Sequence, residues 1–175
     1  MDLHYQNIEI RNAGEADARI LASWWNDGTV MAHAGFPMGL GTTAEKIAVD
    51  LASDSDDTHR RLILLWNERP IGEMCYKNLK NGSADIGIKI CESRYQEKGI
   101  GRIALSMLIK ELFRMGYSKI VLDTSPKNTR AQHVYEKLGF RKLRVNVDSW
   151  KNQLGQLESS VDYELTEDTF INFAV

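Results

Sequence analysis

The residues best suited to chemistry form a short segment near the middle of the chain, ahead of a strongly periodic stretch. The segment consists of Gln96, Glu97, Lys98, Gly99, Ile100, Gly101 and Arg102. The start of a helix leaves about four backbone N–H groups unpaired and carries roughly half a positive charge. Two glycines would let an anion approach those N–H groups without meeting a Cβ atom. The segment therefore predicts a binding site for a diphosphate.

The same glycines also match the pattern of dinucleotide-binding folds, and Asp123 lies at about the distance expected of a ribose-binding carboxylate. In those folds the first glycine follows its strand almost directly. Here a mostly polar stretch, residues 91–98, separates Ile90 from Gly99. The glycines also come past the middle of the chain, so few residues remain for the other strands of a doubly wound sheet. A nicotinamide dinucleotide site is therefore disfavoured.

Helices are expected both before and after the glycine segment in the sequence. Apolar residues at helical spacing predict a helix from residue 99 to about residue 115 that ends at Gly116. A shorter helix over 129–138 follows, with Asn128 at its N-cap and Gly139 at its exit. Two more are expected, one from about residue 15 and one from about Thr43, which can cap it, to about residue 53, with a glycine-rich loop at 30–41 between them.

The remaining apolar runs predict strands, at 8–11, 61–66, 70–76, 84–90, 120–122, 140–147 and 160–165. Most of them follow one another through short turns, such as Asn81-Gly82, and one strand-helix-strand unit lies in the middle. The expected fold class is α+β, with a mixed, mostly antiparallel central sheet of six to seven strands flanked by helices.

The composition fits a single domain over residues 1–175, because 43% of the residues are hydrophobic and no repeat or linker interrupts them. The 22 Lys and Arg residues nearly balance 24 Asp and Glu residues, so no basic field is available for nucleic acid. Neither a signal peptide nor a membrane-spanning run is evident, which predicts a cytoplasmic location. Cys75 and Cys91 lack metal-ligand spacing, so free thiols and no metal are expected.

A longer pattern joins the glycine segment to the helix after the next strand. It reads Gln-x-x-Gly-x-Gly and then Asn-x-x-Ala-x-x-x-Tyr-x-x-x-Gly-Phe, and its members are Gln96, Gly99, Gly101, Asn128, Ala131, Tyr135, Gly139 and Phe140. Across roughly residues 84 to 140 the chain resembles the GNAT superfamily of acyl-coenzyme A dependent N-acetyltransferases. Its ends resemble the ribosomal-protein, polyamine and aminoglycoside branches more loosely.

The resemblance implies that acetyl-CoA is the co-substrate. In this superfamily the backbone amides from the Gln to just past the second Gly hold the diphosphate, which here means residues 96–102. Lys98 and Arg102 could add charge-assisted contacts to the phosphate oxygens. A helix start with solvated basic residues is the alternative interpretation.

The resemblance also implies that the strand before the motif diverges from its parallel neighbour. Amides of the co-substrate would then pair with backbone groups near Ile88, Lys89 and Ile90. Asn128 would hydrogen-bond the pantetheine arm, and Ala131 would keep that wall thin. A plain helix cap and a core alanine would give the same two residues.

Proton transfer needs an acid and a base. Tyr135 lies one helical turn beyond Ala131, so its hydroxyl could protonate the departing thiolate, and a pKa near 10 suits a donor at neutral pH. A core tyrosine whose hydroxyl bonds a carbonyl is the alternative interpretation. An alkyl ammonium with a pKa near 10.4 must lose a proton before it attacks. Asp85 matches the position of a glutamate base in some members, Glu73 is the other candidate, Glu92 is a third, and a water chain could serve instead.

The predicted function is direct transfer of an acetyl group from acetyl-CoA to a primary amine. The acceptor would be a small polycationic amine or the N-terminus of a peptide or protein. The alternative is a non-catalytic sensor or interaction module that binds acyl-CoA. The expected partners include neither nucleic acid nor membrane, and a homodimer through the terminal strands is a further expectation.

Overall fold

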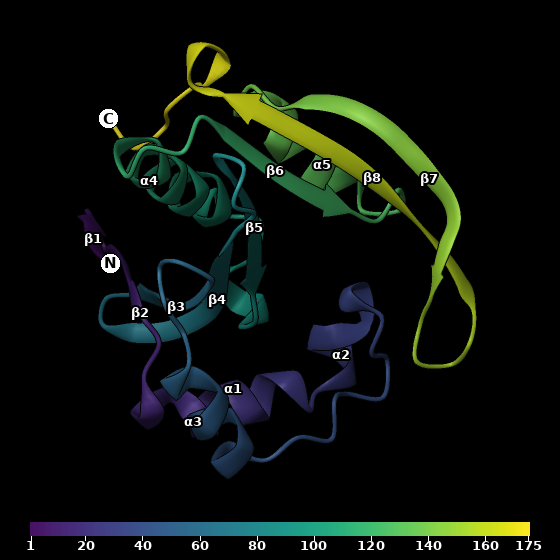
Figure 1. Ribbon diagram of the computed structural model, residues 1–175. Coiled ribbons are helices and arrows are strands. Elements are labelled where there is room, and N and C mark those ends of the chain that lie inside the picture. The colour runs from purple at the N-terminus through teal and green to yellow at the C-terminus, as the bar shows by residue number, and fades with distance from the viewer.

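The computed structural model describes all 175 residues and contains one eight-stranded sheet in the order β1-β2-β3-β4-β5-β6-β8-β7 (Figure 1). Its strands are β1 (Asp2–Tyr5), β2 (Ile8–Asn12), β3 (His59–Trp66), β4 (Arg69–Asn78), β5 (Ser83–Ile90), β6 (Lys119–Thr124), β7 (Arg141–Lys151) and β8 (Leu157–Thr166). Only β5 and β6 pair in parallel, and every other pair is antiparallel. The predicted α+β class is confirmed.

The eighth strand is β1, which the sequence did not predict. Its residues alternate between exposed and half-buried, so it lacks the fully buried positions that mark β2. It exists because Leu3 pairs with Ile10 across a hairpin at the edge of the sheet. The strands β7 and β8 are also longer than predicted, and the turn between them shrinks to residues 152–156.

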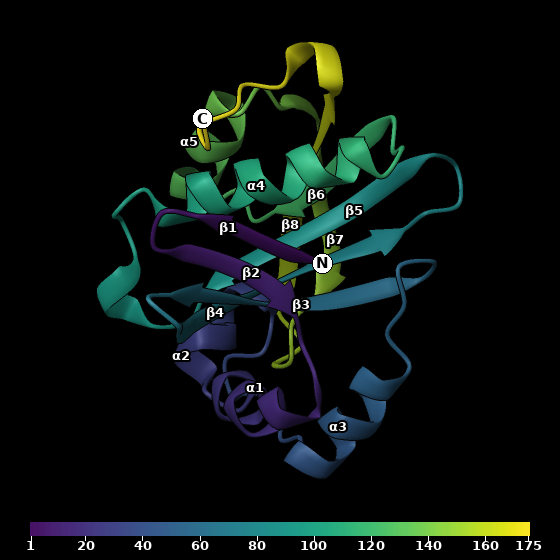
Figure 2. The same cartoon turned by 90° about the vertical axis from the view of Figure 1, so that its left-hand side faces the viewer.

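Helices cover both faces of the sheet (Figures 1 and 2). On one face α4 (Ile100–Arg114) and α5 (Thr129–Lys137) enclose the larger core, a cluster of 25 buried residues. On the other face α1 (Ala18–Trp25) and α3 (Ala44–Ala52) enclose a smaller cluster of nine. No helix has the length and apolar character that a membrane crossing requires.

Side-chain caps fix the starts of the helices near the site. The Thr43 hydroxyl accepts a hydrogen bond from the Lys46 N–H at 3.2 Å, and Asn128 Oδ1 accepts from the Ala131 N–H at 3.2 Å. Both caps are at the predicted positions. The predicted glycine-rich loop contains the one-turn helix α2 (Gly28–Met31), whose cap is Asp27, and the 3₁₀ turn Ala32–Ala34.

The strands β5 and β6 pair over only three residues. Ser83, Ala84 and Asp85 face residues 119–121, but β5 continues to Ile90 and β6 to Thr124 without further pairing. The two strands therefore diverge beyond Asp85, as the resemblance implied. The divergence leaves residues 86–90 without a strand partner on the β6 side.

Candidate active site

A cleft of about 720 Å³ lies where β5 leaves β6, between the start of α4, α5 and the α2 segment. It brings together most of the residues predicted to bind the co-substrate, and with them Tyr135, the predicted acid. The co-substrate residues are Ile88, Lys89, Ile90, Gln96, Glu97, Gly99, Gly101, Arg102, Asn128 and Ala131. The exceptions are Lys98, which stands 6.0 Å over the Tyr95 ring, and Ile100, whose side chain is buried in the core.

The segment ahead of α4 presents an unbroken row of free backbone donors. The N–H groups of residues 97–102 donate to no protein acceptor, and the first paired one is Ile103, which donates to Gly99 O at 3.3 Å. Glu97 and Gly99 adopt left-handed conformations, with φ of 61° and 78°. Successive N–H groups in such a turn at a helix start converge on an anion. The row can hold a diphosphate.

Gln96 corrects one detail of the sequence prediction. Its N–H donates to Ser93 O at 3.0 Å, so it is not available to a phosphate. Its side-chain Nε2 donates to Ile90 O at 2.8 Å. Gln96 therefore fastens the turn to the end of β5, and the free donors begin at Glu97.

Gly99 and Gly101 differ in why a glycine suits the position. At Gly99 the φ of 78° favours a residue without a Cβ, and the space beside it is open. At Gly101 a Cβ would meet Ile90 Cδ1 at 3.5 Å, which is an ordinary contact. The protein's own packing therefore does not require Gly101, whereas a ligand approaching the backbone would.

Arg102 carries a buried polar atom with no partner. Its Nε is buried and makes no hydrogen bond, while its guanidinium lies 4.2 Å over the Phe173 ring. A buried donor without an acceptor costs about 1–3 kcal/mol. Because Arg102 lines the cleft, a phosphate oxygen of a bound ligand is a suitable acceptor.

Sequence reasoning missed the basic face of α5. Arg130, His133 and Lys137 line the cleft, and their spacing of three and four residues places them on one face of the helix. That spacing is visible in the sequence and was the available signal. Arg130 also forms an ion pair with Glu97 at 2.7 Å across the mouth of the cleft. These side chains suit a polyanionic ligand.

Asn128 and Tyr135 occupy the wall that α5 contributes. Asn128 uses Oδ1 as the helix cap, which leaves its Nδ2 group without a protein acceptor. The Tyr135 ring is buried and packs edge-on against Phe140 and Tyr163, at centroid distances of 5.8 Å in each case. Its hydroxyl has no hydrogen-bond partner in the protein. Burial and the nearby Asp123 carboxylate raise the pKa of Tyr135 to about 12.

Two of the carboxylates considered as bases are already engaged. Glu73 accepts from the Trp25 indole N–H at 2.9 Å and from Lys89 Nζ at 3.0 Å. Glu92 accepts from the indole N–H of the buried Trp24 at 3.1 Å. Both oxygens of Glu73 are engaged by these donors, so the geometry disfavours Glu73 as the base.

The Asp85 carboxylate, unlike those of Glu73 and Glu92, is not bonded to another side chain. Asp85 lies on the sheet face opposite α4, because its neighbours Ala84 and Ile86 are in the core under that helix. Its carboxylate has no hydrogen bond or ion pair. Burial, followed by repulsion from Asp123, raises the pKa of Asp85 above its ordinary value. It does not line the cleft but lies at the point where the two strands separate.

Asp123 is a functional candidate that the sequence analysis considered only as the ribose-binding carboxylate of a dinucleotide site. It lies on the diverging part of β6, opposite Asp162 of β8. It follows two residues after Val121, the register partner of Asp85, and its charge raises the pKa of both Asp85 and Tyr135. Only the folded register could reveal that position.

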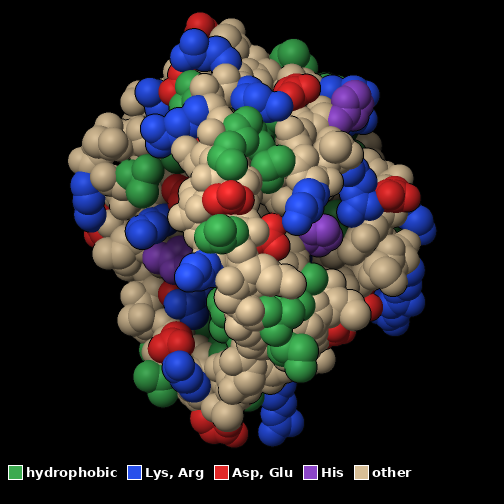
Figure 3. All heavy atoms as spheres, turned by 90° about the vertical axis from the view of Figure 1, so that its right-hand side faces the viewer, with side chains coloured by type: hydrophobic (Ala, Val, Ile, Leu, Met, Phe, Trp, Pro, Cys, Tyr) green, Lys and Arg blue, Asp and Glu red, His purple; other side chains and the backbone are tan.

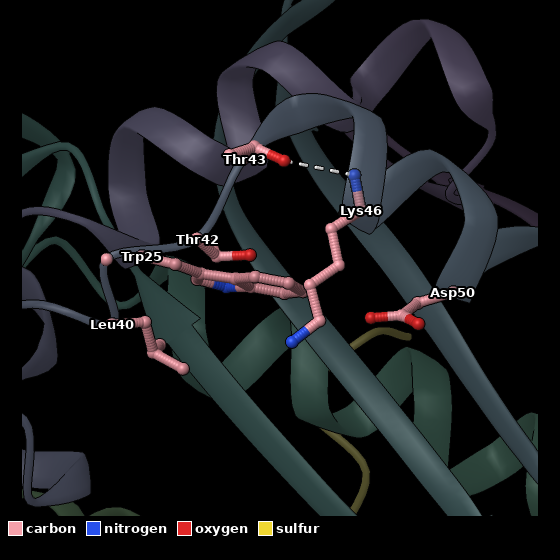
Figure 4. A pocket seen from close by; sticks show the side chains of 7 residues that line it. Trp25, Leu40, Thr42, Thr43, Lys46 and Asp50 are labelled. Carbon is pink, nitrogen blue, oxygen red and sulfur yellow. Dashed lines mark hydrogen bonds between the residues drawn. The ribbon is translucent and has the colours of Figure 1, made fainter.

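A second, smaller pocket of about 220 Å³ lies between the end of α1, residues 40–43 and α3. Figure 4 shows the Trp25 ring beside Leu40 and Lys46, with the Asp50 carboxylate next to the lysine. None of the predicted catalytic or co-substrate residues lines it. Trp25 separates this pocket from Glu73, to which its indole N–H is bonded.

The chain matches the family model described as an acetyltransferase (GNAT) domain over residues 7–141. The fold is similar to a spermidine N-acetyltransferase from Vibrio cholerae solved with CoA and spermine, with a TM-score of 0.81, 20% identity and coverage of 95% of this chain and 99% of that one. It is also similar to a ribosomal-protein-alanine N-acetyltransferase from Brucella melitensis, with a TM-score of 0.76, 18% identity and coverage of 90% and 98%.

A curated relative, an uncharacterised protein of Methanocaldococcus jannaschii, is 33% identical over 76 residues. This match covers 43% of the chain and 16% of the relative. The family match spans most of the chain, including the cleft, the row of free N–H groups and the start of α5. The chain belongs to the GNAT acetyltransferase family.

Proposed function

We propose that this protein transfers an acetyl group from acetyl-CoA directly to a primary amine. One observation carries the proposal: six consecutive unpaired N–H groups, those of residues 97–102, lie in the segment that borders the cleft where β5 and β6 part. The unpaired Arg102 Nε in the same cleft supports the fit to a diphosphate.

Each wall of the cleft would bind a different part of acetyl-CoA. The N–H row and Arg102 bind the diphosphate, and the basic face of α5 adds charge complementarity through Arg130 and Lys137. The free edge of β5 at Ile88 and Lys89 offers backbone groups to an extended, amide-containing arm, and Asn128 Nδ2 donates from the opposite side. Acetyl-CoA supplies an activated acyl group in its thioester, so positioning and proton transfer are what the protein must add.

The proton-handling groups lie on either side of the divergence. Tyr135 lines the cleft and keeps its proton at neutral pH, and a hydrogen bond from its hydroxyl to the sulfur would stabilise the leaving group. Asp85 accepts the proton of the amine, directly or through a water molecule, because its raised pKa makes it a better base than an ordinary aspartate. Glu73 holds Trp25 and Lys89 in place instead.

The acceptor is an amine that is positively charged before it reacts. Asp85 and Asp123 form no ion pair with the protein, and an ammonium group approaching them would be attracted by both. The names of two similar structures include a spermidine and a ribosomal-protein-alanine acetyltransferase, which supports testing both amine classes.

Two measurements test the proposal. Calorimetry with acetyl-CoA should show saturable binding, and free-thiol release should be stimulated by spermidine, by a tripeptide that begins with alanine or by kanamycin. Absence of binding at millimolar acetyl-CoA would refute the proposal. Binding without thiol release from any amine would favour the sensor alternative.

A further inference from the structure

The tip of the β7–β8 hairpin is bonded to the loop that follows α2, far away in sequence. Gln153 makes all three hydrogen bonds. Its N–H donates to Gly35 O at 2.8 Å, its Oε1 accepts from the Met38 N–H at 2.9 Å, and its Nε2 donates to Gly39 O at 2.8 Å. A single side-chain amide thus pairs with two backbone groups of the loop.

The loop has little freedom to take another path at this point. Gly35 and Gly39 both have positive φ, 92° and 74°. A Cβ at position 35 would lie 2.4 Å from Trp150 Cζ3, and one at position 39 would lie 2.2 Å from Asn26 O. The loop backbone therefore lies directly against the hairpin at one end and against the end of α1 at the other.

The same segment forms a wall of the cleft. Thr29, Val30 and His33 line the cleft opposite the α5 side. At the sheet, Lys89 Nζ lies 3.0 Å from Glu73 and 3.1 Å from the sulfur of Met31 in α2. The wall is consequently held from two directions, by Lys89 at the sheet and by Gln153 at the hairpin.

The residues around Gln153 indicate that no ion pair holds the loop to the hairpin. Positive and negative side chains are mixed on the face that the hairpin occupies (Figure 3). Apolar side chains are exposed beside the connection, with Met38 at 73% and Leu154 at 56%. Hydrogen bonds to the backbone, and not ion pairs, therefore fix the loop there.

We infer that Gln153 is a positioning residue for the amine acceptor. It holds residues 35–39 against the hairpin and thereby sets the distance of the wall formed by Thr29, Val30 and His33 from the reacting end of the cleft. The inference rests on the proposed acetyltransferase function. The diphosphate end of the cleft is formed by other elements, so Gln153 has no part in binding acetyl-CoA.

The test compares Gln153→Ala with Gln156→Ala. Gln156 lies in the same hairpin, but its side chain accepts only from Asn152 within that hairpin, at 2.9 Å. The substrate is the amine that the wild type uses best among spermidine, the alanine tripeptide and kanamycin. In Gln153→Ala the KM for this amine should rise on the order of tenfold. The Kd for acetyl-CoA and kcat should change less than about twofold in both variants.

Hydrogen exchange gives a readout that needs no turnover. The Met38 N–H is protected by Gln153 Oε1, so peptides covering residues 36–41 should exchange faster in Gln153→Ala and not in Gln156→Ala. An unchanged amine KM in Gln153→Ala, beside an active wild type, overturns the inference. An equal rise in Gln156→Ala overturns it as well. A wild type that releases no thiol with any amine refutes the proposed function itself.

Discussion

Removing the hydroxyl of Tyr135 tests the proposed acid with little disturbance to the protein. The ring is 8% exposed and packs edge-on against Phe140 and Tyr163, contacts that a phenylalanine keeps. The hydroxyl makes no hydrogen bond in the protein, so the free energy of unfolding should change by roughly 0.5 kcal/mol or less.

The effect on turnover should be far larger. General acid catalysis contributes about 10²- to 10⁴-fold, which corresponds to roughly 3–5 kcal/mol in the activation free energy. The pKa of Tyr135 is raised to about 12, mainly by burial, so the phenol is a weaker acid than a free tyrosine. We therefore expect kcat of Tyr135→Phe to fall at the lower end of that range, by about 10²-fold. Thiol release at saturating amine and acetyl-CoA measures it.

Tyr163→Phe is the matched control. Tyr163 is fully buried beside Tyr135, but its hydroxyl has two acceptors within reach of its one proton, Glu136 Oε1 at 3.1 Å and Gln132 Oε1 at 3.3 Å. Its loss should lower the free energy of unfolding by about 1 kcal/mol and leave kcat within about twofold. Full kcat in Tyr135→Phe, or an equal loss of kcat in both variants, would refute the reasoning.

Three further changes probe the diphosphate site, the base and the turn. Arg102→Ala should weaken acetyl-CoA binding about 10- to 100-fold by calorimetry, whereas Lys98→Ala, outside the cleft, should change it less than about threefold. Folding raises the pKa of Asp85, so the protonated carboxyl favours the folded state at low pH, and this stability is lost as the pH rises through the folded-state pKa. Asp85→Asn should therefore unfold at higher denaturant than the wild type at pH 8, with a gain that disappears below about pH 4, and should lose kcat; equal midpoints at pH 8 would contradict this. Gly99→Ala, at a φ of 78°, should cost roughly 1–2 kcal/mol of stability in urea unfolding, and no loss would show that the turn relaxes.

The local part of the fold was predictable because it depends on near neighbours. The caps at Thr43 and Asn128, the apolar face of α4 and the turn at Asn81-Gly82 are all set within a few residues. The strand β1 was missed because Leu3 and Tyr5 are only half-buried, so the hydrophobic signal is weak. The basic face of α5 was readable from its spacing, but a solvated surface gives the same spacing.

The long-range part of the site was not predictable. An apolar strand at 86–90 has the same sequence pattern whether it pairs with β6 or leaves it. Trp25 reaches Glu73 from 48 positions away, and no local signal indicates that this carboxylate is engaged. The closeness of Asp123 to Asp85 depends on the parallel register, which only the folded chain defines.

The three-pair ladder between β5 and β6 divides the sheet into two halves, one containing β1–β5 and the other containing β6, β8 and β7. A molecule bound in the opening would contact both halves and replace strand pairing that the protein itself lacks. At a concentration 100 times its Kd it would add about 2.7 kcal/mol to the free energy of unfolding. Binding in the opening would then strengthen the contact between the two halves of the sheet, and the melting temperature would rise with the concentration of the bound molecule.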